Sequence, residues 1–306
     1  MLKARFLALS VALLIASPAF PLVPPSAAQW AATVANGYRV TPNIAYVKAN
    51  NYEARLDVYV PAGAGPHPTV LHIHGGGWTG GSKEAVGLRL LPYLEMGFAV
   101  VNATYRLANV SEAPAAVEDC RCALRWIIQH AKEYGFDVNR LVTMGYSAGG
   151  HLALTTAMLP DTAGLDRQCP GPEELRVSAI VNWYGITDVA DLLDGPNRRD
   201  YAVQWLGSRT DRVDVARRLS PLTYVREKLP PVLTIHGDAD PTVPYSHATR
   251  LHAALQQIGA TSELVMIPGG RHGGFPPDQQ MRAVEAVRAF LGRHGLLPAL
   301  SRQTSR

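Results

Sequence analysis

The chain has 306 residues, of which 47% are hydrophobic and 18% are charged, and its formal net charge at pH 7 is +4. This hydrophobic fraction can build a sizeable core, and the charged fraction is too low for an intrinsically disordered chain. The sequence contains no tandem repeats or heptads, which excludes solenoids and coiled coils. Its basic residues form no run, so nucleic acid is not expected as a partner.

Residues 1–28 have the three parts of a secretory signal peptide. Lys3 and Arg5 supply the basic start, residues 6–15 are apolar, and small residues at 26–28 provide a cleavage site. A membrane anchor is the alternative, but the apolar stretch is shorter than the about 20 residues that a spanning helix needs. We therefore expect a cleaved signal peptide, a secreted or periplasmic protein, and no membrane span.

The rest of the chain alternates between predicted strands and predicted helices. An antiparallel hairpin is expected over residues 43–60, where apolar side chains alternate. Continuous apolar runs, which are typical of strands buried on both faces of a parallel sheet, follow at 69–73, 98–103, 140–144, 177–183, 232–235 and 263–267. Helical patterns lie between them at about 84–96, 114–134, 148–159, 246–258 and 278–294. The alternation predicts an α/β fold with a mostly parallel central sheet covered by helices on both faces.

Residues 29–297 are predicted to form a single domain. Residues 187–226 break the alternation, because they are rich in Asp and Arg and carry no strand pattern. We interpret this stretch as a small cap-like insertion over the carboxyl edge of the sheet. Residues 298–306 are polar and are expected to form a loose tail.

Three cysteines, Cys120, Cys122 and Cys169, allow at most one internal disulfide. Cys120 and Cys122 lie in a predicted helix, where residues two apart point in different directions. A disulfide from either Cys120 or Cys122 to Cys169 is possible. None of the three has the spacing of zinc ligands, so no metal site is expected from them.

Residues Gly145-Tyr146-Ser147-Ala148-Gly149 match the pattern Gly-x-Ser-x-Gly, between a predicted strand and a predicted helix. A nucleophilic serine on such a sharp turn needs glycine neighbours, because the chain passes close to itself. A glycine-rich turn can also be purely structural. The flanking strand and helix favour the nucleophile interpretation, with the Ser147 hydroxyl exposed at the start of the helix.

The segment 74–78, His-Gly-Gly-Gly-Trp, follows another predicted strand. Its glycines would let backbone N–H groups approach a developing oxyanion, and we expect the donors to be Gly76, Gly77 and Ala148. His74 is interpreted as bracing the loop. Because backbone donors stabilise the charge in such a mechanism, no metal is expected, and the absence of a nucleotide-binding glycine motif predicts no nucleotide cofactor.

A carboxylate and a histidine follow the last two predicted strands. Asp238 and Asp240 lie after 232–235, and His272 lies in a glycine-rich segment after 263–267. The chain order Ser, Asp, His is that of α/β-hydrolases. His272 would take the proton from Ser147, and an aspartate would orient its imidazole.

Together these motifs make the chain resemble α/β-hydrolase carboxylesterases related to hormone-sensitive lipase, and most of all the bifunctional feruloyl and acetyl-xylan esterase-like (BD-FAE) branch. The resemblance covers roughly residues 43–294 and rests on 74–78, 105–108, 145–149, 236–244 and 271–273. It implies the α/β-hydrolase fold and a serine esterase for short acyl groups, such as acetyl or feruloyl esters of plant polysaccharide. In the family the second aspartate of the loop is catalytic, which implies Asp240 and leaves Asp238 to cap a turn. Lipase relatives carry Pro-Glu where this chain continues with Asn109, which favours the smaller esterase branch.

Five aromatic residues flank the expected site, and they either line a substrate pocket or pack in the core: Trp78, Tyr146, Trp183, Tyr184 and Phe275. The substrate would be a small-molecule or polysaccharide-linked ester. The same triad could instead cleave amides, as in arylformamidases or prolyl-oligopeptidase-type peptidases. A catalytically silent binding protein is an alternative of another class, although such proteins usually lack a triad residue or the oxyanion glycines. The sequence carries no signal for an oligomeric state.

Overall fold

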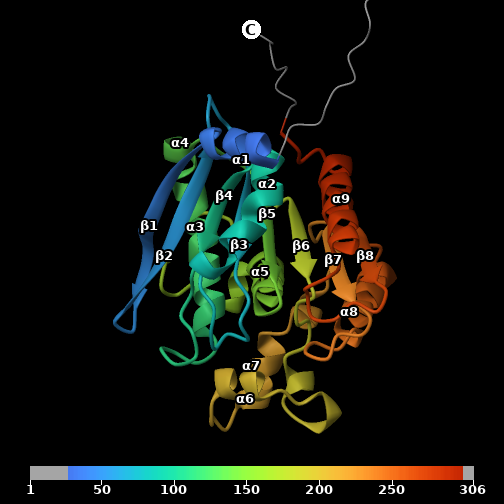
Figure 1. The fold of residues 1–306 in the computed structure, drawn as a ribbon. Helices are drawn as coiled ribbons and strands as arrows, with labels where there is room; N and C mark the ends of the chain where they lie inside the picture. The colour runs from blue at the N-terminus through green and yellow to red at the C-terminus, as the bar shows by residue number, and fades with distance from the viewer. Residues whose placement is uncertain (1–26, 299–306) are drawn as a thin grey trace, which may run out of the picture.

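The computed structural model describes residues 27–298, which fold around one eight-stranded sheet of order β1-β2-β4-β3-β5-β6-β7-β8 (Figure 1). β1 (Tyr38–Ala49) and β2 (Tyr52–Pro61) form the predicted hairpin, and β2 pairs antiparallel with β4. The other pairings are parallel and join β3 (His67–Ile73), β4 (Ala99–Ala103), β5 (Phe136–Tyr146), β6 (Ala179–Trp183), β7 (Val232–Gly237) and β8 (Ser262–Ile267). The predicted mostly parallel sheet is confirmed.

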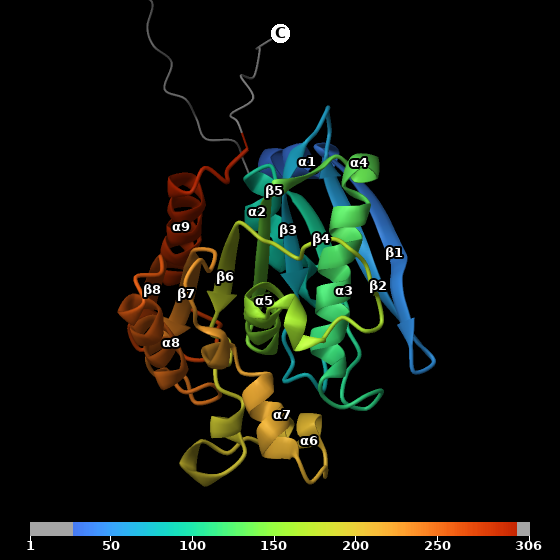
Figure 2. The same ribbon diagram turned by 180° about the vertical axis from the view of Figure 1, so that it is seen from behind.

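Helices cover both faces of this sheet (Figures 1 and 2). One face carries α3 (Ala115–Gln129), α5 (Ala148–Met158) and α8 (Ser246–Gln257), whose apolar side chains share a core cluster with the strands. The other face carries α2 (Leu91–Glu95) and α9 (Pro277–Arg293). The predicted helical coverage of both faces is therefore confirmed.

Two predicted helices are divided in the structure. The pattern at 84–96 consists of a 3₁₀ helix, Glu84–Leu90, followed by α2, in which proline takes an early position that needs no N–H donor. The pattern at 114–134 is interrupted at His130, which separates α3 from α4 (Ala131–Tyr134). The remaining short 3₁₀ helices are Asp161–Ala163, Ala190–Leu192, Gly195–Asn197 and Pro221–Tyr224.

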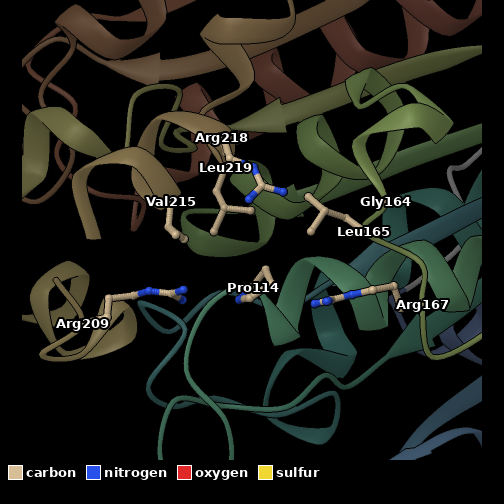
Figure 3. A pocket seen from close by; sticks show the side chains of 8 residues that line it. All are labelled: Pro114, Gly164, Leu165, Arg167, Arg209, Val215, Arg218 and Leu219. Atoms are coloured by element: carbon tan, nitrogen blue, oxygen red, sulfur yellow. The ribbon is translucent and has the colours of Figure 1, made fainter. Parts of the chain in front are cut away.

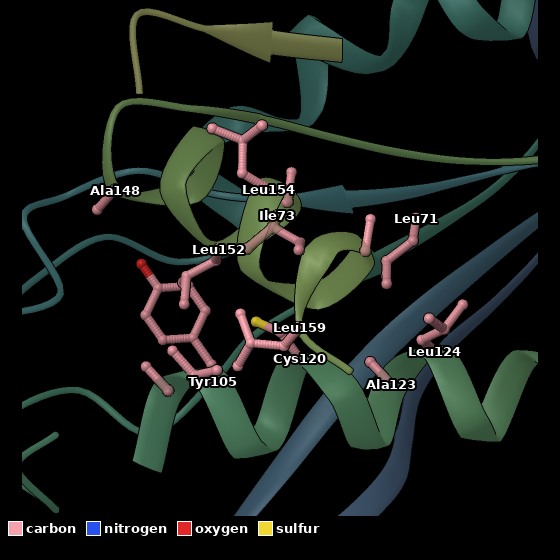
Figure 4. Packing of buried hydrophobic residues seen from close by; sticks show 14 of the residues in the cluster. Leu71, Ile73, Tyr105, Cys120, Ala123, Leu124, Ala148, Leu152, Leu154 and Leu159 are labelled. Carbon is pink, nitrogen blue, oxygen red and sulfur yellow. The ribbon is translucent and has the colours of Figure 1, made fainter. Parts of the chain in front are cut away.

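Alternation along the central strands supplies both cores. Leu71 and Ile73 of β3 face α3 and α5, where Figure 4 shows them near Leu152 and Ala123. Val70, which precedes Leu71 and points to the other face of the sheet, packs in the core cluster beneath α2 and α9. Leu71 and Ile73 are fully buried, and burial of each such side chain contributes about 1.5–3 kcal/mol.

The segment between β6 and β7 contains the predicted insertion, 187–226. It forms α6 (Asp200–Leu206) and α7 (Arg212–Arg218) beyond the carboxyl ends of the parallel strands (Figures 1 and 2). The site motifs also follow the carboxyl ends of these strands. The insertion therefore lies next to them.

The predicted signal peptide, 1–28, lies outside the described residues except for its last two positions, and so does the predicted tail beyond residue 298. α1 (Ala27–Asn36) begins within those two positions and was not predicted, although its alanines favour a helix. Between residues 27 and 298 no helix combines the length and apolar character needed to cross a membrane.

Cys122 of α3 forms a disulfide with Cys169, whereas Cys120 is a buried free thiol. The two α3 cysteines point in different directions. Cys120 packs in the main core cluster, and Cys122 faces Val47 and Ala54 of the hairpin. Of the two disulfides that the sequence allowed, the structure contains the one between Cys122 and Cys169.

Candidate active site

Ser147 lies on the tight turn between β5 and α5. Its φ of 57° is unusual for a residue with a side chain, and such a conformation costs of the order of 1–3 kcal/mol. A Cβ on Gly145 would lie 2.2 Å from the carbonyl oxygen of Gly149, and a Cβ on Gly149 would lie 2.1 Å from that of Ile73. Both glycines of the motif are therefore required by the backbone.

His272 connects Ser147 to Asp240. Its Nε2 lies 2.7 Å from Ser147 Oγ, and its Nδ1 lies 2.7 Å from Asp240 Oδ2. With a proton on Nδ1, the ring donates to the carboxylate and its Nε2 accepts from the serine hydroxyl. The structure thus brings the three predicted catalytic residues into one hydrogen-bonded chain, at the ends of β5, β7 and β8.

The Asp240 carboxylate is buried but fully surrounded by donors. Its Oδ1 accepts from the N–H groups of Thr242 and Val243, at 2.8 and 3.0 Å, and its Oδ2 also lies 3.2 Å from His236 Nε2. Burial alone would raise the pKa of this carboxyl, but the hydrogen bonds from His236 and His272 outweigh it and hold the pKa well below its ordinary value. Asp240 therefore stays ionised and can stabilise a protonated His272.

Asp238, the other aspartate of this loop, has a different role. Its side chain is exposed, and its Oδ1 accepts from the N–H of Gly269 at 2.7 Å. This bond ties the loop after β7 to the turn after β8. The contact fits the predicted turn-capping role.

The glycine loop after β3 faces Ser147. Gly76 and Gly77 line the same cavity as Ser147, and for residues 27–298 no acceptor is found for the N–H group of either glycine. Ala148 begins α5, where the first N–H groups have no acceptor within the helix. Ala148 itself is fully buried and is not among the residues that line the cavity. The three predicted oxyanion donors are therefore grouped around Ser147.

His74 supports the glycine loop after β3, which is its predicted role. Its ring stacks on Tyr105 with centroids 4.3 Å apart, and its Nδ1 lies 2.8 Å from the carbonyl oxygen of Gly75. Burial lowers the pKa of His74, so the ring is neutral at neutral pH. A buried neutral ring fixed in this way supports the loop.

A cavity of about 370 Å³ opens beside the three residues, and we call it the triad cavity. Among the predicted site residues, those that line it are Gly76, Gly77, Tyr146, Ser147, Tyr184 and His272. Further lining residues that the sequence analysis missed are Val86, Arg89, Tyr201 and Thr242. The volume is that of a site for a small ligand.

Three of the five aromatic residues considered for a pocket do not line the triad cavity. Trp78 is fully buried and stacks on Trp205 of α6, with ring centroids 4.1 Å apart. Trp183 and Phe275 are also buried and pack in the core cluster that includes the tyrosines beside them. These three are core residues, because their rings fill the space beneath the loops.

Three of the four missed residues come from segments without a site motif, whereas Thr242 lies in the loop 236–244 that also carries Asp240. Val86 and Arg89 belong to the 3₁₀ helix after the glycine loop, and Tyr201 belongs to α6. Periodicity identifies a helix but does not show which of its residues reach a cavity built by other segments. The aromatic Tyr201 within a polar insertion was the one available signal.

A second cavity, of about 200 Å³, lies between the start of α3 and α7 (Figure 3). Arg167, Arg209 and Arg218 line it together with apolar residues, but Arg167 is paired with Glu118, and none of the predicted site residues lines it. Within residues 27–298, no three His, Cys, Asp or Glu side chains are grouped to hold a metal ion. The triad cavity is therefore the candidate active site.

Comparison with known proteins adds sequence relatives. Residues 56–255 match the family model described as BD-FAE. Esterase LipQ of Mycobacterium tuberculosis is 29% identical over 238 residues, which cover 74% of this chain and 55% of the relative. The probable carboxylic ester hydrolase LipM of the same organism is 32% identical over 203 residues, which cover 63% of this chain and 46% of the relative. The chain thus spans about half the length of these curated relatives.

One solved structure has a similar fold over nearly its full length. Esterase 2 of Thermogutta terrifontis, in a structure with bound butyrate, has a TM-score of 0.71 and 29% identity to this chain. The match covers 87% of this chain and 97% of that one. The fold of the described residues is therefore the α/β-hydrolase fold of an esterase.

Proposed function

Because the chain belongs to the BD-FAE family, we propose that it is a serine carboxylic-ester hydrolase. One observation carries this proposal: Ser147, His272 and Asp240 form a continuous hydrogen-bonded chain that opens into the triad cavity. The names of the relatives, esterase and carboxylic ester hydrolase, support it.

In the proposed first step, Ser147 Oγ attacks the ester carbonyl while His272 Nε2 accepts the hydroxyl proton. The N–H groups of Gly76, Gly77 and Ala148 would donate to the resulting oxyanion. Removal of one such donor commonly costs about 3–4 kcal/mol of barrier, so the loop supplies a large share of catalysis.

Collapse of the tetrahedral intermediate would break the bond to the alcohol, which takes its proton from His272. This step leaves an acyl group on Ser147. His272 would then accept a proton from water, whose oxygen attacks the acyl carbon. The bond from that carbon to Ser147 Oγ breaks, His272 returns the proton to Oγ, and the acid leaves. Asp240 stays ionised throughout and stabilises the charged imidazole, as its low pKa allows.

We propose short acyl groups as the substrate class, with acetyl or feruloyl esters of plant polysaccharide as the first candidates. The triad cavity has room for a small acyl or aromatic group, and a polysaccharide chain would extend beyond it. The bound butyrate of the Thermogutta terrifontis esterase supports a short acyl chain.

We also propose that the protein works after export. The signal-peptide pattern at 1–28 and the disulfide between Cys122 and Cys169 support this, because disulfides persist in oxidising compartments. Fractionation of cells that express the full chain should find the protein outside the cytosol, with a new N-terminus near residue 29. An intact N-terminus on cytosolic protein would contradict export.

Hydrolysis of p-nitrophenyl acetate, butyrate and laurate tests the proposed activity. The rate should fall with chain length, and Ser147→Ala should lower kcat by about a millionfold, as loss of a catalytic serine does. Ser246→Ala, which changes an exposed serine at the start of α8, is the matched control. Folded wild-type protein without activity on any of the esters would overturn the proposal, and faster cleavage of the corresponding anilides would favour an amide hydrolase.

A further inference from the structure

Arg89 gives the triad cavity a positive charge. Among the described residues that line this cavity, the others apart from His272 are glycines, Val86, and hydroxyl-bearing side chains. No lining residue is an aspartate or glutamate, and the buried Asp240 carboxylate already has donors on both of its oxygens. A cation in such a cleft creates a focused positive potential that attracts anionic ligands.

Two tyrosines hold the Arg89 side chain in place. Its Nη1 donates to the Tyr184 hydroxyl at 3.3 Å, and its guanidinium carbon lies 4.5 Å from the centre of the Tyr146 ring. None of the ion pairs found within residues 27–298 includes Arg89. Because a guanidinium has five N–H donors, most of them stay available to a ligand.

Two other arginines of the chain, Arg106 and Arg167, are used differently. Arg106 is buried and donates to both oxygens of Asp119, and Arg167 in the second cavity is paired with Glu118. These carboxylates satisfy the guanidinium groups within the protein. Arg89 has the same donor set at an exposed position in the candidate active site, but no carboxylate of the described chain meets it.

The two tyrosines also connect Arg89 to the reacting groups. Tyr146 directly precedes Ser147, and the Tyr184 ring packs against the His272 ring with centroids 4.8 Å apart. A group bound by Arg89 would therefore lie one side chain away from the nucleophile and the base. In a cavity of about 370 Å³ it would be part of the molecule whose ester reacts.

We propose that Arg89 makes this site selective for esters that carry a carboxylate. The inference rests on the proposed esterase function and narrows its substrate class. The planar guanidinium can donate two parallel hydrogen bonds to a carboxylate, and its tyrosine contacts orient it before the ligand arrives. The carboxylate is unchanged by the reaction, in which water still cleaves only the ester C–O bond.

The carboxylate could belong to the acid part of the ester or to the alcohol part. The first case is a hemiester of a dicarboxylic acid, tested with monoethyl succinate against ethyl succinamate. The second is an ester of a carboxylated alcohol, tested with 4-carboxyphenyl butyrate against 4-carbamoylphenyl butyrate. In each pair a neutral carboxamide replaces the carboxylate at nearly the same size. The change in the ratio of kcat/KM values between wild type and Arg89→Gln isolates the effect of the charge, because the intrinsic reactivity of the two esters cancels.

Wild-type protein should prefer the carboxylate substrate in one pair by about 10- to 100-fold, the range expected for hydrogen bonds to a charged group. The preference should shrink as salt is added, because the cavity is open to solvent. Arg89→Gln should bring the ratio close to one, and Arg89→Lys should keep part of it. Arg288→Gln, which changes a partly exposed arginine of α9 that is paired with Glu95 of α2, should leave the ratio unchanged.

A wild-type ratio near one in both pairs would overturn the inference. So would a ratio that survives in Arg89→Gln, or an Arg89→Gln variant in which both members of a pair lose the same factor. These results differ from failure of the proposed function, in which the wild type cleaves neither the carboxylates nor the carboxamides. The wild-type ratio and its salt dependence need no variant, so the test stands even where Arg89→Gln folds poorly.

Discussion

The turn that presents Ser147 and the wall of the cavity beside it are built in different ways. The turn joins two buried elements of the main fold, and Gly145 and Gly149 are fixed there by close backbone contacts. The wall residues Arg89 and Tyr201 come from a short 3₁₀ helix and from α6, which lie outside the sheet. The proposed chemistry therefore depends on the edge of the sheet, and the proposed substrate choice depends on segments outside the sheet.

After the loss of Ser147 itself, the largest expected effect is at the loop after β7, where two aspartates two positions apart have different partners. Asp240→Asn should lower kcat by about 10⁴-fold, because the amide cannot hold His272 in the required tautomer. Asp238→Asn keeps an oxygen that can accept from Gly269, so its kcat should change by less than about twofold. Steady-state hydrolysis of p-nitrophenyl butyrate measures both, and similar losses in the two variants would contradict the assignment of Asp240.

Trp205 tests whether the insertion supports the chemistry. It is fully buried and stacks on Trp78 of the glycine loop, so Trp205→Ala should cost about 3–5 kcal/mol of folding stability and also lower kcat. Phe290→Ala is the matched control, because Phe290 is equally buried but belongs to α9, which covers the opposite face of the sheet. Urea unfolding and kcat at a temperature where both variants are folded separate the two effects. Equal kcat in the two variants would show that the stack supports stability alone.

The disulfide should affect stability without affecting the site. Cys122 and Cys169 close a loop with a sequence separation of 47, and the chain-entropy account predicts a loss of about 4 kcal/mol of unfolding free energy when both become alanine. Neither cysteine lines the triad cavity, so kcat/KM should stay within about twofold of wild type. Cys120→Ala, at the buried free thiol, should cost less. A large fall in kcat/KM for the double variant would contradict this separation.

The smallest expected effect is the acid dependence of stability. The pKa of Asp240 is lower in the folded chain than its ordinary value of 3.8, so the folded state binds this proton less readily than the unfolded state. The ionised Asp240 carboxylate therefore contributes its full stabilisation at pH values above 3.8, and this contribution is lost as the pH falls from there through the pKa of the folded state. The difference in unfolding free energy between wild type and Asp240→Asn should narrow from about pH 5 to about pH 2.5. A difference that grows on acidification would contradict the direction of the shift.

Local patterns were enough to predict most of the fold and the triad. Continuous apolar runs identified the parallel strands, and each strand was followed directly by the motif that its carboxyl end carries. Because the ends of parallel strands meet at one edge, sequence order alone placed Ser147, Asp240 and His272 near one another. The glycines of the turn could be interpreted from sequence because their constraint is a local backbone contact.

The cavity wall could not be predicted in the same way. Whether an aromatic ring lines a cavity or fills a core depends on which distant segment covers it, and Trp78 is covered by Trp205 from the insertion. Arg89 has an ordinary place in a helical pattern, and its importance comes from Tyr184, 95 positions away. The choice between Cys120 and Cys122 likewise depended on how α3 is turned toward the hairpin.

The hydrogen bonds of Asp240 have a consequence for how a proton can travel. His236 and the N–H groups of Thr242 and Val243 contact the carboxylate independently of His272. The imidazole can therefore swivel between an alcohol and a water molecule while the buried anion remains solvated by the protein. Asp240 keeps its position, and His272 can move away from it while carrying a proton, because the carboxylate still has other hydrogen-bond donors.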